Sequence, residues 1–493
     1  MPERATPTPA EREVSRSHSS RDTDEGLNER KGATLLKRGR AMPQKSSVQL
    51  ELAFGVNGEA AMADASVEAC AKRQETELPG ASSQMEKVCE RRNLLAALER
   101  VRRNAGSPGI DGMTVEDLKS YLMTEWPRIR EELLGGRYQP QTVRRVRIPK
   151  PGGGERELGI PTVLDRFIQQ ALLQVLQPQF DPTFSDHSYG FRPGRRAHDA
   201  VRRAQRYIQA GRRWVVDIDL EAFFDRVNHD ILMGRLKKRI ADRRVLVLIR
   251  RYLGAGILVN GVVLERYEGT PQGGPLSPLL ANVLLDEVDR ELEKRGHAFC
   301  RYADDLNIYV RTRRAGERVM QSMCRLYADL HLRINEIKSA VARATERKFL
   351  GFSYWIGPGR EVKRRVAPQA LQRMKDVIRE LTRPTIGRSL AQVCRRLREY
   401  LLGWKGYFQF AQTPGLFQNL DEWIRHRLRA LQLKHWKRGT VTFRELRARG
   451  MSIRAASRVA ANGRRWWKNS AMAIHIALPN AYFDGLGLPR LVA

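Results

Sequence analysis

Residues 299–310 read Phe-Cys-Arg-Tyr-Ala-Asp-Asp-Leu-Asn-Ile-Tyr-Val, and the rest of the chain is organised around them. Two alternating apolar runs flank adjacent acids, a pattern typical of a β-hairpin with Asp304 and Asp305 at its tip. The tip lacks the glycine that a two-residue hairpin turn usually requires. Neighbouring carboxylates repel each other unless a cation lies between them. A solvated turn is the ordinary interpretation of such a pair, so a metal site requires further acids elsewhere in the chain.

A second acidic stretch provides them. Residues 214–220 read Trp-Val-Val-Asp-Ile-Asp-Leu, so Asp217 and Asp219 project from the same face of a predicted strand. Acids on a buried strand are costly unless they are paired or bound to a metal. Three carboxylates from two strands suit Mg²⁺ ions that grip a nucleoside triphosphate and a 3′-hydroxyl. The two stretches together predict a magnesium site.

With these residues the chain resembles bacterial group II intron-encoded reverse transcriptase/maturases. Tyr-Ala-Asp-Asp at 302–305 is similar to the polymerase signature of reverse transcriptases, and other blocks follow in the order of the family, over roughly residues 86–490. These blocks are residues 106–112 (Gly-Ser-Pro-Gly-Ile-Asp-Gly), 148–151 (Ile-Pro-Lys-Pro), 190–194 (Gly-Phe-Arg-Pro-Gly), 219–225 (Asp-Leu-Glu-Ala-Phe-Phe-Asp), 271–278 (Pro-Gln-Gly-Gly-Pro-Leu-Ser-Pro) and 349–352 (Phe-Leu-Gly-Phe).

The resemblance implies an RNA-directed DNA polymerase in which Asp219, Asp304 and Asp305 are catalytic and hold two Mg²⁺ ions. In the family, the first ligand stands five residues before an aromatic that packs under the nucleotide sugar, which selects Asp219 over Asp217 and identifies Phe224. Other positions match residues that contact the incoming dNTP in the family: Lys150, Arg156, Gln272 and Lys338. Two simpler interpretations stay open: Phe224 as a core residue, and residues 150–156 as an ordinary exposed loop.

The charge indicates a polyanionic partner. The formal net charge is +33, and residues 361–493 hold 27 Lys and Arg against 8 Asp and Glu. Basic surfaces bind nucleic acid through phosphate contacts and counterion release. The partners that the resemblance implies are a group II intron RNA, an RNA template with a DNA primer, target DNA and dNTPs. The candidate nucleic-acid-binding residues are Arg192, Arg395, Arg396, Arg425, Arg464 and Arg465, whereas Trp404, Tyr407 and Trp423 are expected in a core.

Other classes of site receive no support. The five cysteines show no paired spacing for zinc or a disulfide framework, and no apolar run is long enough to span a membrane. We expect a cytoplasmic bacterial protein, associated with the nucleoid when engaged on DNA. The clustered Cys and His of the nuclease domain that some relatives carry are not found, so we expect no endonuclease. The sequence does not indicate an oligomeric state.

The expected fold is an α/β (α+β) right-hand polymerase. We expect a disordered leader over residues 1–85, fingers over 86–210, and a palm with an antiparallel sheet over 211–358. A helical thumb/maturase domain over 359–440 and a basic tail over 441–493 would follow. Within the palm, residues 228–253 read as one helix, and residues 257–264 as a hairpin with an Asn-Gly turn.

Three other functions remain open at this point. The chain could be a reverse transcriptase of another lineage, such as a retron or a defence-associated enzyme, although the basic thumb argues against this. It could be an RNA-binding splicing factor with an unused polymerase site, although all three carboxylates are present. A generic palm-fold nucleotidyltransferase or cyclase is disfavoured by residues 271–278 and the long basic thumb. An intron RNA flanking the reading frame would separate the intron-encoded enzyme from other lineages.

Overall fold

The computed structural model describes residues 84–149, 155–259, 262–264, 267–270, 273–384, 387–462, 465–471 and 474–492, all within the unit formed by residues 47–493. Nearly all of the predicted leader falls outside the described residues. So do three of the predicted site residues: Lys150, Gln272 and Arg464. Arg156 is placed by its backbone alone.

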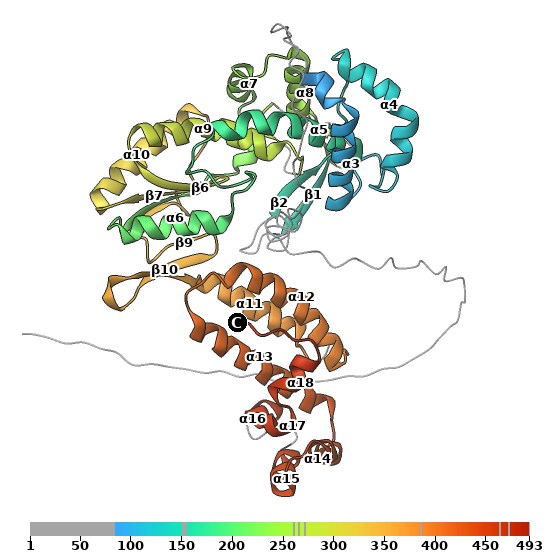
Figure 1. Ribbon diagram of the computed structural model, residues 1–493, viewed down its shortest axis with the longest axis vertical. Coiled ribbons are helices and arrows are strands. Elements are labelled where there is room, and N and C mark those ends of the chain that lie inside the picture. The colour runs from blue at the N-terminus through green and yellow to red at the C-terminus, as the bar shows by residue number, and fades with distance from the viewer. Residues whose placement is uncertain are drawn as a thin grey trace, which may run out of the picture. The chain divides into compact units, whose positions relative to one another are not determined.

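The central element is a four-stranded sheet that carries both acidic stretches. Its strands are β3 (Trp214–Ile218), β6 (Ala298–Tyr302), β7 (Asp305–Val310) and β8 (Ala340–Arg343), in the order β6-β7-β3-β8. Every neighbouring pair is antiparallel, so the predicted antiparallel palm sheet is confirmed. Figure 1 shows helix α6 (Ala197–Gln209) on one side of these strands, and α9 (Ser277–Lys294) and α10 (Arg313–Asp329) on the other.

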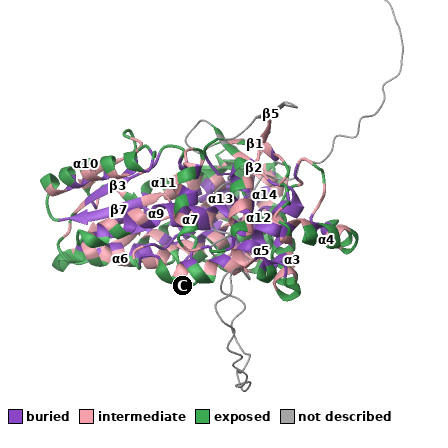
Figure 2. Ribbon diagram, turned by 90° about the horizontal axis from the view of Figure 1, so that it is seen from above, coloured by how far each residue is buried: buried purple, intermediate pink, exposed green. Residues whose placement is uncertain are grey.

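The strands are buried on both faces because successive side chains enter different cores. Val216, Ile218 and Ile308 belong to the core shared with α9 and α10. Val215 and Tyr309 belong to a second core, which they share with α6 and the C-terminal helices. Figure 2 shows the strands buried while α6 and α10 present exposed outer faces. Because side chains alternate along a strand, Asp217 and Asp305 project toward the face of the second core.

A second sheet joins a hairpin of the expected fingers to one that was expected in the palm. It comprises β1 (Val143–Pro149), β2 (Glu155–Ile160), β4 (Ile257–Val259) and β5 (Val262–Leu264), in the order β2-β1-β4-β5, because β4 pairs with β1 and not with the palm sheet. The predicted hairpin over 257–264 is confirmed, with its Asn-Gly turn outside the described residues. The helices of this region are α2 (Gln84–Val88), α3 (Arg91–Asn104), α4 (Leu118–Leu134) and α5 (Val163–Phe180).

The single helix expected over residues 228–253 is two helices. These are α7 (His229–Lys237) and α8 (Arg243–Gly254). The break occurs at Asp242, which is buried: Oδ1 accepts a hydrogen bond from the Arg244 backbone N–H at 2.9 Å and thereby caps α8, and Oδ2 accepts one from the Met85 backbone N–H at 3.0 Å. A capping acid starts a new helix, which apolar periodicity alone does not reveal.

A three-stranded sheet leads into a helical thumb. The sheet contains β9 (Lys348–Phe349), β10 (Phe352–Ile356) and β11 (Val362–Val366). Three helices follow, as predicted: α11 (Pro368–Leu381), α12 (Leu390–Phe408) and α13 (Pro414–His435). Trp404 is buried, and Tyr407 and Trp423 pack partly buried against the same core. Short 3₁₀ turns occupy Asp181–Thr183, Phe223–Asp225 and Pro358–Arg360.

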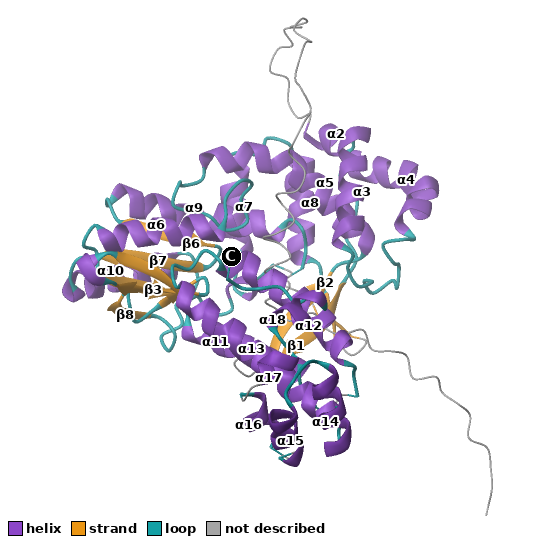
Figure 3. Cartoon of the chain, turned by 60° about the horizontal axis from the view of Figure 1, so that its bottom comes forward, coloured by secondary structure: helices purple, strands orange, loops and turns teal. Residues whose placement is uncertain are grey.

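The segment expected as a basic tail is folded. It contains α14 (Gly439–Ala448), α15 (Ile453–Ala461), α16 (Trp466–Ser470), α17 (Ile474–Ala477) and α18 (Asn480–Gly485), of which Figure 3 shows α14 to α17 gathered together. Apolar side chains from these helices enter the thumb core. None of the helices in the described part of the chain combines the length and the apolar composition needed to cross a membrane.

Candidate active site

The two central aspartates stand at a tight turn between β6 and β7. Tyr302 pairs with Asp305, which leaves Ala303 and Asp304 as the turn residues. Ala303 has φ +57°, a left-handed conformation that costs a non-glycine residue about 1–2 kcal/mol. The turn therefore has the conformation that normally calls for glycine, although alanine occupies it. Gly190 makes this approach possible, since a Cβ there would lie 2.3 Å from the Ala303 nitrogen.

A buried arginine holds the turn in place. Arg301 is 0% exposed, and its Nη1 donates to the Ala303 carbonyl at 3.0 Å and to Asn282 Oδ1 at 2.9 Å. Its Nε donates to Asp289 Oδ1 at 2.8 Å. Asn282 Nδ2 in turn donates to the Gly190 carbonyl at 2.9 Å, so the network connects both segments that meet at the turn. This network was not predictable from the sequence, because no local spacing links a strand arginine to acids and amides on α9.

The three predicted catalytic aspartates lie near one another. Ile218, the last residue of β3, pairs with Leu306, so Asp219, which directly follows the strand, comes into line with Asp305. Burial raises the pKa of Asp305 well above its usual value, and the negative charges of Asp217, Asp304 and Asp219 raise it further. Negative charge is thus concentrated at the point where the two strands end.

Two cations oppose this charge. Lys338 Nζ lies 3.3 Å from Asp219 Oδ2, so two predicted site residues are in contact. Arg347 Nη2 lies 2.6 Å from Asp217 Oδ2. Burial raises the pKa of Asp217, and the charge and hydrogen bond of Arg347 act in the opposite direction. Arg347 was not predicted, since it stands 130 residues from its partner.

The acids suit a divalent cation by their chemistry. No three His, Cys, Asp or Glu side chains among the described residues converge closely enough to enclose an ion, and Asp219 is engaged by Lys338. Carboxylate oxygens are nevertheless the ligands that hard cations prefer. Burial, and then the negative charges of Asp217, Asp304 and Asp219, raise the pKa of Asp305, and a bound cation would offset both effects. The chemistry of Asp219, Asp304 and Asp305 therefore suits magnesium, although their side chains do not enclose an ion.

Three of the five predicted nucleotide-binding residues lie within the described residues: Phe224, Lys338 and, by its backbone, Arg156. Phe224 is half-buried against the core of α9 and α10, with its ring centroid 5.1 Å from that of Phe223. Lys338 keeps 64% of its side chain exposed beside Asp219. Arg156 pairs through its backbone with Ile148, near the tip of the β1–β2 hairpin.

Two of the residues predicted to contact nucleic acid, Arg192 and Arg425, are buried in the protein. The Arg192 side chain is 3% exposed, and its Nε donates to Asp181 Oδ1 at 2.8 Å. Arg425 is 2% exposed and lies between Asp421, at 3.1 Å, and Asp484, at 2.9 Å. Both guanidinium groups bind protein and thus support the fold instead of contacting a phosphate.

The remaining described candidates are accessible. Arg395 and Arg396 are exposed on α12, and Arg465 is exposed at the start of α16. Their exposure leaves them available to a phosphate backbone.

Comparison with known proteins identifies two regions of the chain. Residues 148–354 match the family described as "Reverse transcriptase (RNA-dependent DNA polymerase)". Residues 371–450 match "Group II intron, maturase-specific domain". The first region contains the acidic sheet together with β2, β4 and β5, and the second contains most of the thumb and α14.

Individual proteins similar to this chain include intron-encoded proteins, in agreement with the two family matches. "Protein YkfC" of Escherichia coli (strain K12) is 34% identical over 283 residues, which cover 50% of this chain and 74% of that protein. "Group II intron-encoded protein LtrA" of Lactococcus lactis subsp. cremoris is 41% identical over 181 residues, covering 36% of this chain and 29% of LtrA. "Putative COX1/OXI3 intron 1 protein" of Saccharomyces cerevisiae is 32% identical over 201 residues, covering 41% of this chain and 24% of that protein. The matched regions thus span less than a third of LtrA and of the yeast protein.

The polymerase region, the maturase-specific region and these relatives agree with the right-hand architecture of the acidic sheet, fingers and thumb. The chain belongs to the group II intron-encoded reverse transcriptase/maturases, a family of RNA-directed DNA polymerases.

Proposed function

We propose that this chain copies the RNA of a group II intron into DNA, adding dNTPs to the 3′-end of a DNA primer annealed to an RNA template. The observation that carries the proposal is the pairing of β3 with β7, which brings Asp219 into line with Asp305 at the turn. Asp219, Asp304 and Asp305 would hold two Mg²⁺ ions. When bound, these ions would lower the pKa of the primer 3′-hydroxyl and stabilise the leaving pyrophosphate.

The side chains around the acids serve substrate placement. The primer 3′-oxygen forms a bond to the α-phosphorus of the dNTP, and the bond to the pyrophosphate breaks. The Lys338 side chain is 64% exposed, so its ammonium group can leave Asp219 and bind an oxygen of the triphosphate instead. The Asp219 carboxylate is then available to bind Mg²⁺. Phe224 lies under the sugar, while Lys150 and Arg156 hold the triphosphate and Gln272 orients the nucleotide against the template.

The parts of the chain divide this task. Fingers over residues 86–210 close on the nucleotide, and the palm over 211–358 carries the acids. The thumb/maturase helices over 359–440, with the folded segment 441–493, grip the intron RNA and assist its splicing. Arg395, Arg396, Arg464 and Arg465 contact phosphates there. Target DNA supplies the insertion site, in the cytoplasm at the nucleoid.

Primer extension tests the polymerase. The substrate is a DNA primer annealed to an RNA template, with dNTPs and Mg²⁺, and wild type is compared with Asp304→Asn and Asp329→Asn. Asp329 is an exposed aspartate at the end of α10, so its variant removes the same charge away from the sheet. We expect cDNA from wild type and Asp329→Asn, and a loss of at least about a thousandfold in Asp304→Asn.

Absence of cDNA from a folded wild type would reject the polymerase. If that wild type still bound intron RNA, the function would be that of a splicing factor. RNA binding by Asp304→Asn equal to wild type separates the two roles, because the maturase helices contribute no carboxylate to the acidic site.

A further inference from the structure

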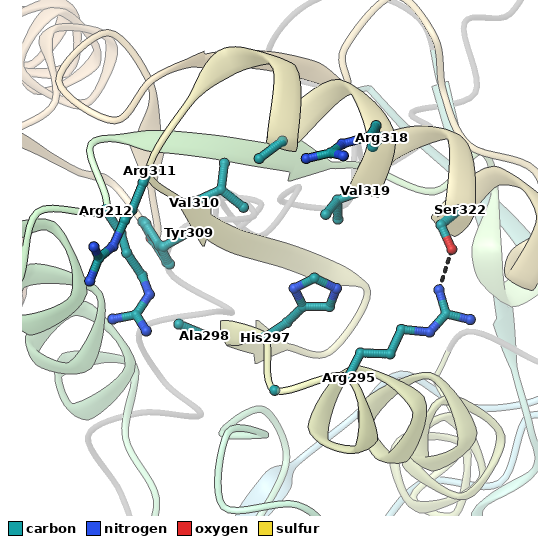
Figure 4. A pocket seen from close by; sticks show the side chains of 12 residues that line it. Arg212, Arg295, His297, Ala298, Tyr309, Val310, Arg311, Arg318, Val319 and Ser322 are labelled. Atoms are coloured by element: carbon teal, nitrogen blue, oxygen red, sulfur yellow. Dashed lines mark hydrogen bonds between the residues drawn. The ribbon is translucent and has the colours of Figure 1, made fainter.

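A cavity lies at the end of the palm sheet that is far from the catalytic aspartates. Its volume is about 510 Å³, within the range of roughly 300–1,000 Å³ typical of small-molecule sites. It is bounded by the loop before β3, the start of β6, the end of β7 and one face of α10. Figure 4 shows arginine side chains on opposite sides of this cavity and the His297 ring between them.

The lining is strongly cationic. Arg212, Arg295, Arg311 and Arg318 line the cavity, and no Asp or Glu is among the lining residues. Within the described part of the chain, Arg295 alone among these four has an acidic partner, Glu291, with 2.7 Å between Nη2 and Oε1. Arg295 also donates to Ser322 across the cavity mouth. Arg311 and Arg318 form no ion pair within the described residues.

Arg295, Arg311 and Arg318 are exposed and Arg212 is half-buried, so the four guanidinium groups stand at the open rim of the cavity, where an anion can reach them. Arginine prefers phosphate, whose oxygens accept two parallel N–H bonds from one guanidinium. The lining also includes the apolar side chains of Val310 and Val319, which suit the sugar or base beside the phosphate.

The cavity is separate from the polymerase site. On the hairpin, Ala298 pairs with Tyr309 at the cavity, and Tyr302 pairs with Asp305 at the catalytic end. Four residues of strand separate Ala298 from Tyr302, which corresponds to about 13 Å. A phosphate bound in the cavity is therefore too far away to take part in nucleotidyl transfer.

We propose that this arginine cavity is a second phosphate-binding site, which takes either a phosphate of the RNA backbone or a free nucleotide. The inference is independent of the metal site, because none of the lining residues belongs to it. In the first case the cavity would add a contact to bound RNA on the palm. In the second it would hold a nucleotide that is not the polymerase substrate.

The test uses the double variant Arg311→Gln/Arg318→Gln in the full-length protein. The control is Arg314→Gln/Arg325→Gln, which removes the same charge from exposed positions outside the cavity on α10, the helix that carries Arg318 and begins two residues after Arg311. Binding of a 40-nucleotide single-stranded RNA is followed by fluorescence anisotropy over a range of salt concentrations. Binding of ATP in EDTA, which removes the metal ions, is followed by calorimetry. Thermal melting establishes that all variants are folded.

If the ligand is RNA, the cavity variant binds about tenfold more weakly than the control. Its slope of log K against log salt should become shallower by about 0.7, since the cavity holds one phosphate and each phosphate contact on a single strand contributes about 0.7. If the ligand is a nucleotide, wild type and control bind ATP in EDTA and the cavity variant does not. Equal RNA affinity, equal salt slope and equal ATP binding in the cavity and control variants would overturn the proposal.

Discussion

Arg301 Nε lies 2.8 Å from Asp289 Oδ1, and neither side chain is exposed to solvent. The same guanidinium donates to the Ala303 carbonyl, one residue before Asp304. A charge that is fully buried below the catalytic turn is thus neutralised by α9 and at the same time fixes the backbone of the turn.

Replacing one partner of this pair is expected to be strongly destabilising. Arg301→Met leaves the Asp289 carboxylate buried without its cation, and breaking a buried pair in this way costs about 3–5 kcal/mol. Urea unfolding measures the loss. The double variant Arg301→Met/Asp289→Leu should recover most of the free energy of unfolding, because apolar replacements of a buried pair are often neutral. Its primer extension should stay low, since the Ala303 carbonyl has lost a donor; full activity would show that Arg301 serves stability alone.

A methyl group at Gly190 is expected to displace the catalytic turn. The added Cβ of Gly190→Ala would lie 2.3 Å from the Ala303 nitrogen and 2.9 Å from the Tyr302 carbonyl carbon, both of them backbone atoms. A displacement of about 1 Å in an active site costs about a hundredfold in rate. We expect that loss in primer extension under saturating dNTP. Gly234→Ala is the control, because a Cβ there meets nothing within 4 Å; equal rates for both variants would contradict this role of Gly190.

Lys338 is expected to govern nucleotide affinity. In Lys338→Gln the contact to Asp219 Oδ2 and the proposed contact to the triphosphate are lost. The KM for dNTP should rise about tenfold, with a smaller change in kcat, because the lost interaction is made in both ground and transition state. The Mg²⁺ concentration for half-maximal rate should fall, since no cation competes for Asp219. Lys294→Gln, at the exposed end of α9, should change neither quantity, and an unchanged KM in Lys338→Gln would remove Lys338 from the nucleotide site.

Acid is expected to weaken the contact between α6 and α12. His198 on α6 stacks on Phe410 with a centroid distance of 4.7 Å, and its Nε2 lies 2.8 Å from the Tyr407 carbonyl oxygen. Burial lowers the pKa of His198 below its ordinary value of about 6.5. The unfolded chain therefore takes up the proton more readily, so the stabilisation is complete above pH 6.5 and is lost as the pH falls below it.

Urea unfolding at pH 7.5, 6.5 and 5.5 measures this dependence. His198→Gln should reduce the loss between pH 7.5 and 5.5, and His475→Gln, at an exposed position on α17, should not. Burial also lowers the pKa of His187, so part of the dependence should persist in His198→Gln. A pH profile identical to that of wild type would exclude His198 as a source.

The parts of the fold that follow local patterns were predictable from the sequence. Alternation along residues 214–220 predicted that Asp217 and Asp219 share one face, and the strand is β3. The acids at 304 and 305 predicted a hairpin tip, which is where they lie. Amphipathic spacing predicted the three thumb helices.

Contacts between distant segments were not predictable. Asp242 looks like one more polar position in a helix until Met85 and Arg244 are seen to donate to it. Arg425 reads as a surface cation because its partner Asp484 lies 59 residues away. The segment after residue 441 was expected to be a tail, because a high density of arginine hides the apolar residues that it buries.

Because successive side chains of β3 and β7 enter two different cores, the palm sheet separates these cores from each other. Asp217 and Asp305 project on the side of α6, and the core on that side includes the thumb helices. α9 and α10 pack against the opposite face of the same strands. A substitution in the core of α9 and α10 therefore lies across the sheet from the acids, whereas one in the second core lies on their own face.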